Sequence, residues 1–171
     1  MFPMQKLDIY LNDHLAGATV GVELSRRAAK GNRGTPNGQF LERLHREIVE
    51  DRRTLLAVVR ALGADMSPAK PALAWIAEKA ARLKLNGQLT GSSPLSRLIE
   101  LEALETGVTG KRSLWQALAR ALPDDARLAT LDLDSLIARA ERQIEDIREH
   151  RLSAAREALA GDASGRAATS H

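Results

Sequence analysis

Apolar residues recur at alternating spacings of three and four along residues 37–62, which is the pattern of a helix that buries one face in a bundle. The positions on that face are Leu41, Leu44, Ile48, Asp51, Leu55, Val58 and Leu62. Similar stripes run along residues 3–30, 93–122 and 132–159. No segment alternates apolar and polar residues for long enough to indicate a strand, so the pattern predicts an all-α protein with four long helices.

Proline, glycine and capping residues mark the ends of these expected helices. Asn37 is a suitable N-cap for the second helix, and Gly63 suits the position just after its last turn. Ser93 followed by Pro94 has the form of an N-cap and a first helical residue, so we expect the third helix to begin there. These signals divide the chain into two helical hairpins.

The connection between the second and third helices, residues 64–92, is much longer than the other two connections. We expect it to contain a shorter helix at residues 68–85. A short connection makes each hairpin antiparallel, whereas a long crossover can return the chain to the other end of the bundle and leave the second and third helices parallel. We therefore expect one domain over residues 1–160, followed by a small, polar and disordered tail at residues 161–171.

Composition narrows the class of protein. The 22 acidic residues are interspersed with 25 basic ones and the net charge is only +3, which argues against a nucleic-acid partner. The chain has no cysteine, and its apolar runs are too short to span a membrane. Its first residues also lack the apolar core of a signal peptide. We therefore expect a cytoplasmic protein without a membrane partner.

Every expected helix places at least one polar group on its inner face, and this is the best functional clue in the chain. The groups are His14 on the first helix, Asp51 on the second, Glu105 on the third, and Gln143 and His150 on the fourth. Because each residue advances about 1.5 Å along a helix, all of them fall within a slab roughly two turns thick. We expect His14, Asp51 and His150 to be mostly buried and in direct or one-water contact, because an unpaired buried charge is costly.

More than one interpretation of this layer remains open. The inner histidines can be metal ligands, or they can form hydrogen bonds to Asp51 across the bundle. Glu105 and Glu102 can face inward, or a modest rotation of the third helix can turn Leu104 inward and leave both carboxylates in solvent. Glu47 can support the layer, but the helical spacing favours Glu47 and Glu50 as surface partners of Arg43, Arg46 or Arg53.

The chain resembles a group of bacterial ferritin-like proteins with no established activity. The resemblance lies in the run SPLSRLIELEAL at residues 93–104 and in the pairs that follow it, Gly110-Lys111 and Leu114-Trp115. It implies a ferritin-like four-helix bundle with a long helical crossover between helices 2 and 3. Members of the ferritin-like superfamily with a metal centre bind two iron or manganese ions, through a Glu on two helices and a Glu-x-x-His pair on the other two.

The metal-binding pattern of that superfamily is incomplete in this chain. Glu50 stands three residues after Glu47, where a histidine would complete the pair on the second helix. Ile147 stands three residues before His150, where the ligand glutamate belongs on the fourth helix. The first helix offers His14 in place of a glutamate. We therefore expect a degenerate metal layer that does not hold a pair of ions.

These observations favour a binding or assembly role over catalysis, with a homodimer as the expected state and no assigned cofactor. The alternative is an iron or manganese protein with metal storage or redox activity. In that case the ligands would be His14, Asp51, Glu105 and His150, supported by Gln143, Glu102 and Glu47. An enzyme that uses a histidine and a carboxylate as a general base is a third possibility, but no motif indicates its substrate.

A cluster of basic residues ends the first expected helix, formed by Arg26, Arg27, Lys30 and Arg33. These side chains can contact a phosphate group, or they can simply complement the negative end of the helix dipole. The pattern favours the second explanation, because cations are common at that end of a helix.

Overall fold

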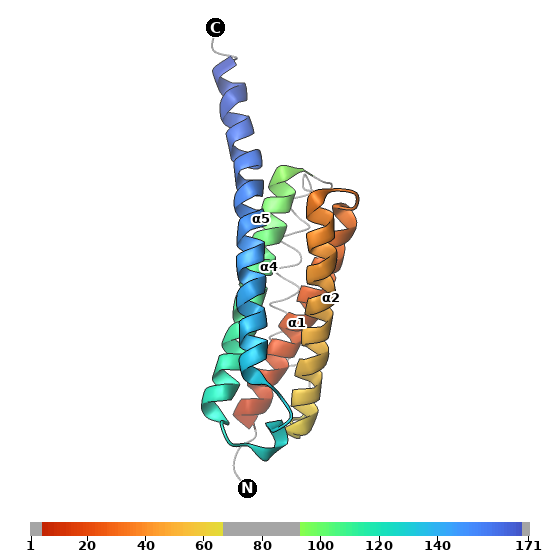
Figure 1. Ribbon diagram of the computed structural model, residues 1–171, viewed down its shortest axis with the longest axis vertical. Coiled ribbons are helices and arrows are strands. Elements are labelled where there is room, and N and C mark those ends of the chain that lie inside the picture. The colour runs from red at the N-terminus through yellow and green to blue at the C-terminus, as the bar shows by residue number, and fades with distance from the viewer. Residues whose placement is uncertain (1–4, 67–92, 169–171) are drawn as a thin grey trace.

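The computed structural model describes residues 5–66 and 93–168, and in those ranges it is entirely helical apart from short connections (Figure 1). The elements are α1 (Gln5–Gly31), α2 (Pro36–Ala61), α4 (Pro94–Ala121), the short 3-10 helix η1 (Ala126–Leu128) and α5 (Leu133–Ala168). The prediction of an all-α protein with four long helices is confirmed for this part of the chain. The shorter helix expected at residues 68–85 lies outside the described residues.

The predicted cap of α4 and the predicted end of α2 are both confirmed. Ser93 caps α4, with Pro94 as the first helical residue, and the Ser93 side-chain oxygen accepts from the Ser96 backbone N–H at 3.1 Å. Gly63 follows α2 with a φ of +68°, the left-handed conformation that glycine adopts without steric cost. The sequence signals therefore place both helix ends correctly.

The predicted N-cap of α2 is wrong by two residues. Thr35 caps the helix, and its Oγ1 accepts from the Gly38 backbone N–H at 3.1 Å. Pro36 then occupies the first helical position, where its fixed φ suits the helix and its missing N–H leaves no donor unpaired. Asn37 lies inside the first turn, and its side chain reaches across to α5 instead of capping.

Contacts at the two ends of the bundle fix the direction of its helices. At the turn end, the Arg97 Nε–H of α4 donates to Asn32 Oδ1 in the α1–α2 turn at 3.1 Å. At the η1 end, Arg127 Nη1 donates to the Leu62 carbonyl oxygen, just after α2, at 3.0 Å. Both α2 and α4 therefore run from the turn end to the η1 end, so they are parallel, as the long crossover predicted (Figure 1).

Among the residues that the structure describes, the apolar core forms two clusters, one toward each end of the bundle. The turn-end core comprises Ala28, Ala29, Phe40, Leu41, Leu44, Ile48, Leu98, Leu101, Leu104, Val108, Ala140, Ile144, Ile147 and Ala154. The η1-end core comprises Leu11, Leu55, Val58, Val59, Leu62, Leu114, Trp115, Leu118 and Leu128. On α2 the first cluster ends at Ile48 and the second begins at Leu55, so about two turns separate them.

The last helix is longer than expected. It ends at Ala168, beyond the expected end near Leu159, and Figure 1 shows its last turns projecting past the other helices. Alanine, the strongest helix former, is frequent in this stretch, and no proline interrupts it. The division into a domain of residues 1–160 and a tail of residues 161–171 stays a prediction.

Candidate functional site

Asp51 lies between the two cores and is held by cations from two other helices. It is only 3% exposed, and no other carboxylate in the described part of the chain is buried. Asp51 Oδ2 accepts from the Lys111 ammonium of α4, and Asp51 Oδ1 accepts from Arg139 Nη2 of α5. The prediction that Asp51 is buried and neutralised is confirmed, but its partners are cations and not histidines.

A glutamine and a second carboxylate complete this group, which we name the ion network: Glu47, Asp51, Lys111, Arg139 and Gln143. The Lys111 ammonium also donates to Gln143 Oε1, so it contacts oxygens from both α2 and α5. Gln143 Nε2 in turn donates to Glu47 Oε2 at 2.8 Å and to Asp51 Oδ2 at 3.3 Å. The ion network therefore joins the α1–α2 hairpin to the α4–α5 hairpin.

The charges of the ion network balance, because two carboxylates face two cations. Glu50, which is exposed, accepts from Arg139 Nη1 at 3.3 Å and adds a further carboxylate at the rim. Burial lowers the pKa of Lys111, and the charge and hydrogen bond of Asp51 oppose that shift. A pairing of this kind avoids the large penalty of leaving a single charge in the core.

Sequence reasoning identified Asp51, Gln143 and Glu47 but did not identify Lys111 and Arg139. Both cations lie one position away from the apolar stripes of their helices, next to Arg112 and Ala140. Long basic side chains can reach inward from such flanking positions, because their aliphatic stems pack on apolar surface while the charged head finds a partner. The sequence signal that could have identified them is a Lys or Arg next to an apolar stripe and level with an inner carboxylate along the bundle axis.

The structure does not bring His150 to Asp51. The His150 Nδ1–H donates to Asn37 Oδ1 at 2.6 Å, and the ring stacks on Phe40 with 3.9 Å between centroids and 10° between planes. Phe40 and Asp51 are eleven residues apart on α2, which is about 16 Å along the helix axis. The expected contact between His150 and Asp51 is therefore wrong, and so is the expected slab of two turns, because an axial separation of about 16 Å corresponds to three helical turns.

His14 also has a partner other than Asp51. Its ring packs edge-on against Tyr10, with 4.6 Å between centroids and 69° between planes. Burial lowers the pKa of His14, with the charge of Asp13 opposing the shift. Within residues 6–66 and 93–160, no group of three or more His, Asp or Glu side chains is placed to hold a metal ion. The joint ligand set of His14, Asp51, Glu105 and His150 therefore has no support in this geometry.

Glu105 lies in a separate place, at the edge of an open groove between α4 and α5. Its Oε2 accepts from Arg151 Nε at 2.5 Å, and both side chains are partly exposed. Glu102, Thr106 and Thr109 complete the lining of this groove, which has a volume of about 350 Å³. Leu104 is buried in the turn-end core, so the third helix has the rotation that turns this leucine inward, with Glu102 exposed and Glu105 at the rim.

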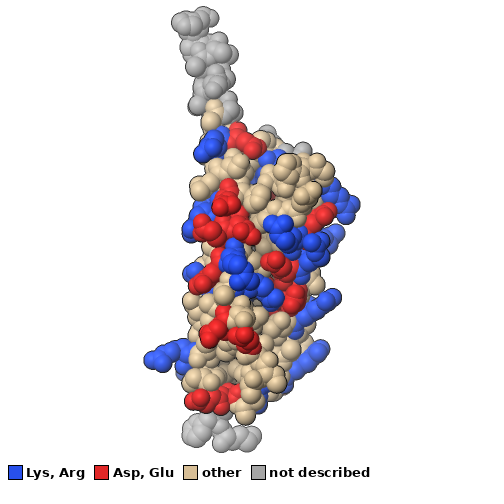
Figure 2. All heavy atoms as spheres, viewed as in Figure 1, with Lys and Arg blue, Asp and Glu red and all other residues tan. Residues whose placement is uncertain are grey.

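Comparisons of the chain with protein-family models, curated proteins and solved structures gave no match. None of the described helices combines the length and apolar character needed to cross a membrane. On the face drawn in Figure 2, Lys and Arg side chains alternate with Asp and Glu side chains. Over residues 5–66 and 93–168, the fold and the site define a bundle of four long helices whose core is divided by an ion network.

Proposed function

We propose that this chain is a ferritin-like helical bundle that acts by binding and assembly, and not by catalysis at a metal centre. The ferritin-like assignment is supported by the parallel α2 and α4 and by the polar groups that lie inside the bundle at mid-height. The non-catalytic role is supported by one observation above all. The Lys111 ammonium contacts oxygens of both Asp51 and Gln143. It therefore occupies the position that a bound cation would take in this layer.

The cations of the ion network oppose the binding of a metal ion. Both carboxylate oxygens of Asp51 accept from cationic side chains, so a divalent ion at Asp51 would lie close to Lys111 and Arg139. Repulsion between such charges is strong where water is excluded. Glu105 is committed in the same way, because Arg151 holds it. The iron or manganese alternative therefore requires the displacement of cations on both helices of the α4–α5 hairpin.

The assembly part of the proposal is a homodimer, and exposed leucines on α5 support it. Leu152 and Leu159 are 53% and 61% exposed, and they lie seven residues apart, which puts them on one face of the helix. Glu157, between the two leucines, pairs with Arg97 of α4, so this face lies on α5 level with the start of α4. Apolar side chains in such a position are typical of contacts between protein chains.

The metal part is tested by elemental analysis of protein purified without chelator, followed by titration with iron(II) and manganese(II). We expect no stoichiometric pair of ions in the wild-type chain or in Lys6→Met, which removes an exposed lysine as a control. Lys111→Met should gain affinity for a divalent ion, because it leaves oxygens of Asp51, Glu47 and Gln143 without their central cation. Two equivalents of tightly bound metal in the wild-type chain, lost in His150→Ala, would overturn the proposal.

The assembly part is tested by sedimentation velocity over a range of protein concentrations. We expect the wild-type chain to sediment as a dimer and the double variant Leu152→Glu/Leu159→Glu to sediment as a folded monomer. A matched control is Arg142→Glu/Arg148→Glu, which places two glutamates at exposed positions of the same helix. A wild-type monomer at every concentration would remove assembly from the proposal.

A further inference from the structure

A pocket with a strong excess of positive charge lies beside the α1–α2 turn, away from the ion network. It has a volume of about 370 Å³. Its charged and titratable lining residues are Arg26, Lys30, Arg33, Arg46, His45 and Glu42. Four permanent cations therefore surround this space, with Glu42 as the single carboxylate that lines it. Pockets that bind small molecules have volumes of about 300–1,000 Å³, so this one has room for a small ligand.

The cations of this pocket have few partners within the protein. Lys30, Arg33 and Arg46 form no ion pair with any other residue that the structure describes. Arg26 pairs with Glu23, at 2.8 Å, on the exposed surface of α1. By contrast, Arg97, Arg139 and Arg151 each hold a carboxylate. Most of the positive charge around the pocket is therefore available to a ligand.

His45 is held in place at the wall of this pocket by a buried hydroxyl. Ser25 is 0% exposed, and its Oγ donates to the Val22 carbonyl oxygen at 3.0 Å. The same Oγ lies 2.9 Å from His45 Nδ1. Because the hydroxyl has only one hydrogen, His45 Nδ1–H donates to Ser25, which leaves Nε2 as the remaining polar atom of the ring. The pocket thus has a fixed polar group in addition to flexible cations.

We propose that this pocket binds a small molecule that carries phosphate groups. Arginine side chains match the geometry of phosphate oxygens, and lysine adds a point charge that phosphate also accepts. The cations come from two helices and the turn between them, so they surround a compact ligand and do not form a long basic face. An extended nucleic acid is disfavoured because acidic side chains interrupt the basic ones on the surface (Figure 2). The inference goes beyond the proposed function and does not depend on the ion network.

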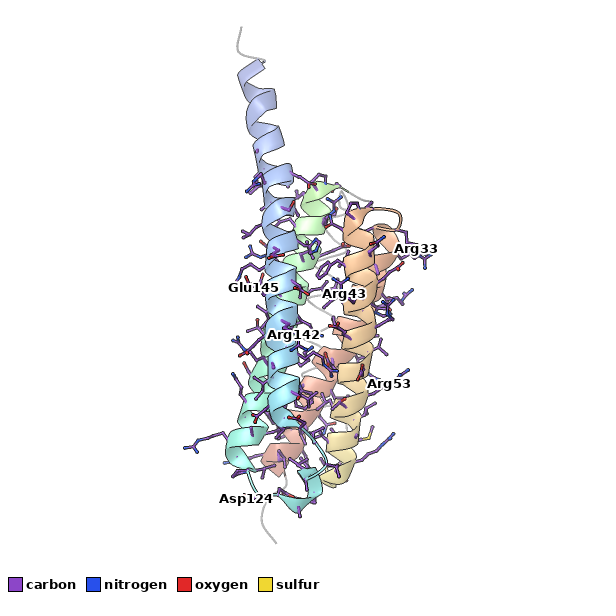
Figure 3. The ribbon with its side chains drawn as sticks, viewed as in Figure 1. Arg33, Arg43, Arg53, Asp124, Arg142 and Glu145 are labelled. Atoms are coloured by element: carbon purple, nitrogen blue, oxygen red, sulfur yellow. The ribbon has the colours of Figure 1, made fainter. Side chains whose placement is uncertain are left out.

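The test is a calorimetric titration of the full chain with inorganic pyrophosphate in about 0.15 M salt, where long-range charge effects are weak. We expect saturable binding of one pyrophosphate, weakened about tenfold or more by Arg46→Gln and by Lys30→Gln. The matched control is Arg53→Gln, since Arg53 is also an exposed arginine of α2 and lies outside the pocket (Figure 3). It should change the dissociation constant by less than about twofold. Glu42→Gln should strengthen binding, because it removes the only negative charge of the lining.

Other outcomes would overturn the inference. Equal weakening by Arg53→Gln and Arg46→Gln would show that pyrophosphate responds to overall charge, and absence of saturable binding would show that no site exists. Tighter binding of a single-stranded oligonucleotide, weakened equally by both variants, would replace the pocket by an extended nucleic-acid surface. All substituted side chains are exposed, so thermal unfolding followed by circular dichroism checks that each variant is folded. Metal content measured on the same samples reports on the proposed function separately.

Discussion

Asp51 and Glu105 are carboxylates at positions whose helical spacing predicts an inward-facing side chain. Each contacts a basic side chain of α5, yet their surroundings differ. The Asp51 side chain is 4% exposed and has Lys111 and Arg139 as partners, whereas the Glu105 side chain is 21% exposed and has Arg151 alone. Glu105 also borders a groove that is open to solvent. Charges that keep access to water lose little when a pair breaks, while buried charges lose a great deal. The comparison therefore predicts very different consequences for equivalent substitutions.

The largest expected effect comes from Asp51→Ala. This change leaves the Lys111 and Arg139 charges without their central carboxylate, so we expect a loss of about 3–5 kcal/mol in the free energy of unfolding, measured by urea denaturation. Asp51→Asn should cost less, because the amide oxygen still accepts from one cation. Glu50→Ala is the control, since Glu50 is exposed and also contacts Arg139. A loss of under about 1 kcal/mol for Asp51→Ala would show that the ion network is not a buried unit.

Double-mutant cycles compare the two pairs directly. We expect a coupling free energy of about 1.5–3 kcal/mol between Asp51 and Lys111, from Asp51→Asn, Lys111→Met and the double variant. The cycle for Glu105 and Arg151 should give about 0.2–1 kcal/mol, in the range of exposed pairs. Equal couplings for the two pairs would contradict the role that burial has in this comparison.

Mild acid tests a different kind of group, a partly buried histidine whose burial outweighs the opposing charge of nearby carboxylates, Asp13 for His14 and Asp146 and Glu149 for His150. Burial lowers the pKa of both His14 and His150 below the ordinary value of 6.5. As the pH falls below that value, the unfolded chain binds protons that the folded chain does not, so the free energy of unfolding decreases. Between about pH 7.5 and 5.5 we expect the free energy of unfolding to decrease in the wild-type chain, and we expect the double variant His14→Gln/His150→Gln to lack this decrease. Identical pH profiles for both proteins would contradict the lowered pKa values.

The smallest expected effect comes from Glu105→Ala. Arg151 keeps access to water in this variant, so the loss in the free energy of unfolding should be about 0.2–1 kcal/mol. The loss should shrink further when the salt concentration rises to about 1 M, because salt screens exposed charges. Thermal unfolding at low and high salt measures both quantities. A loss as large as that of Asp51→Ala would mean that Glu105 lies in the core after all.

Most of the fold was predictable because it depends on local signals. The spacing of apolar residues identified the four helices, and Gly63 and Ser93 marked two of their ends correctly. The N-cap of α2 was misplaced because Thr35 and Asn37 are both good caps, and only Pro36 between them decides which one is used. Because several good capping residues can lie within a few positions of one another, local signals predict the existence of a helix better than its first and last residues.

The site was predictable only in part, because it depends on side chains that reach between helices. The stripe of α2 placed Asp51 in the core, and the stripe of α5 placed Gln143 there. The apolar stripes gave no information on Lys111 or Arg139, since long side chains can turn inward or outward from the edge of a stripe. Counting residues from the helix ends also placed His150 near the level of Asp51, whereas its contacts put it level with Asn37 and Phe40. The count failed because it assumed that the helices end at the same height, and α5 continues to Ala168.

The position of Asp51 between two apolar clusters has a consequence for how the two hairpins find their alignment. Leucine, isoleucine and valine surfaces can slide past one another by one helical turn, about 5.4 Å, with only a modest change in burial. A slide of that size would set Asp51 against the apolar residues of one cluster and would separate it from Lys111 and Arg139. Each misaligned state would then contain unpaired buried charges, at a cost of several kcal/mol. The same carboxylate that adds little to the apolar core therefore selects one register out of several that the apolar residues alone would accept.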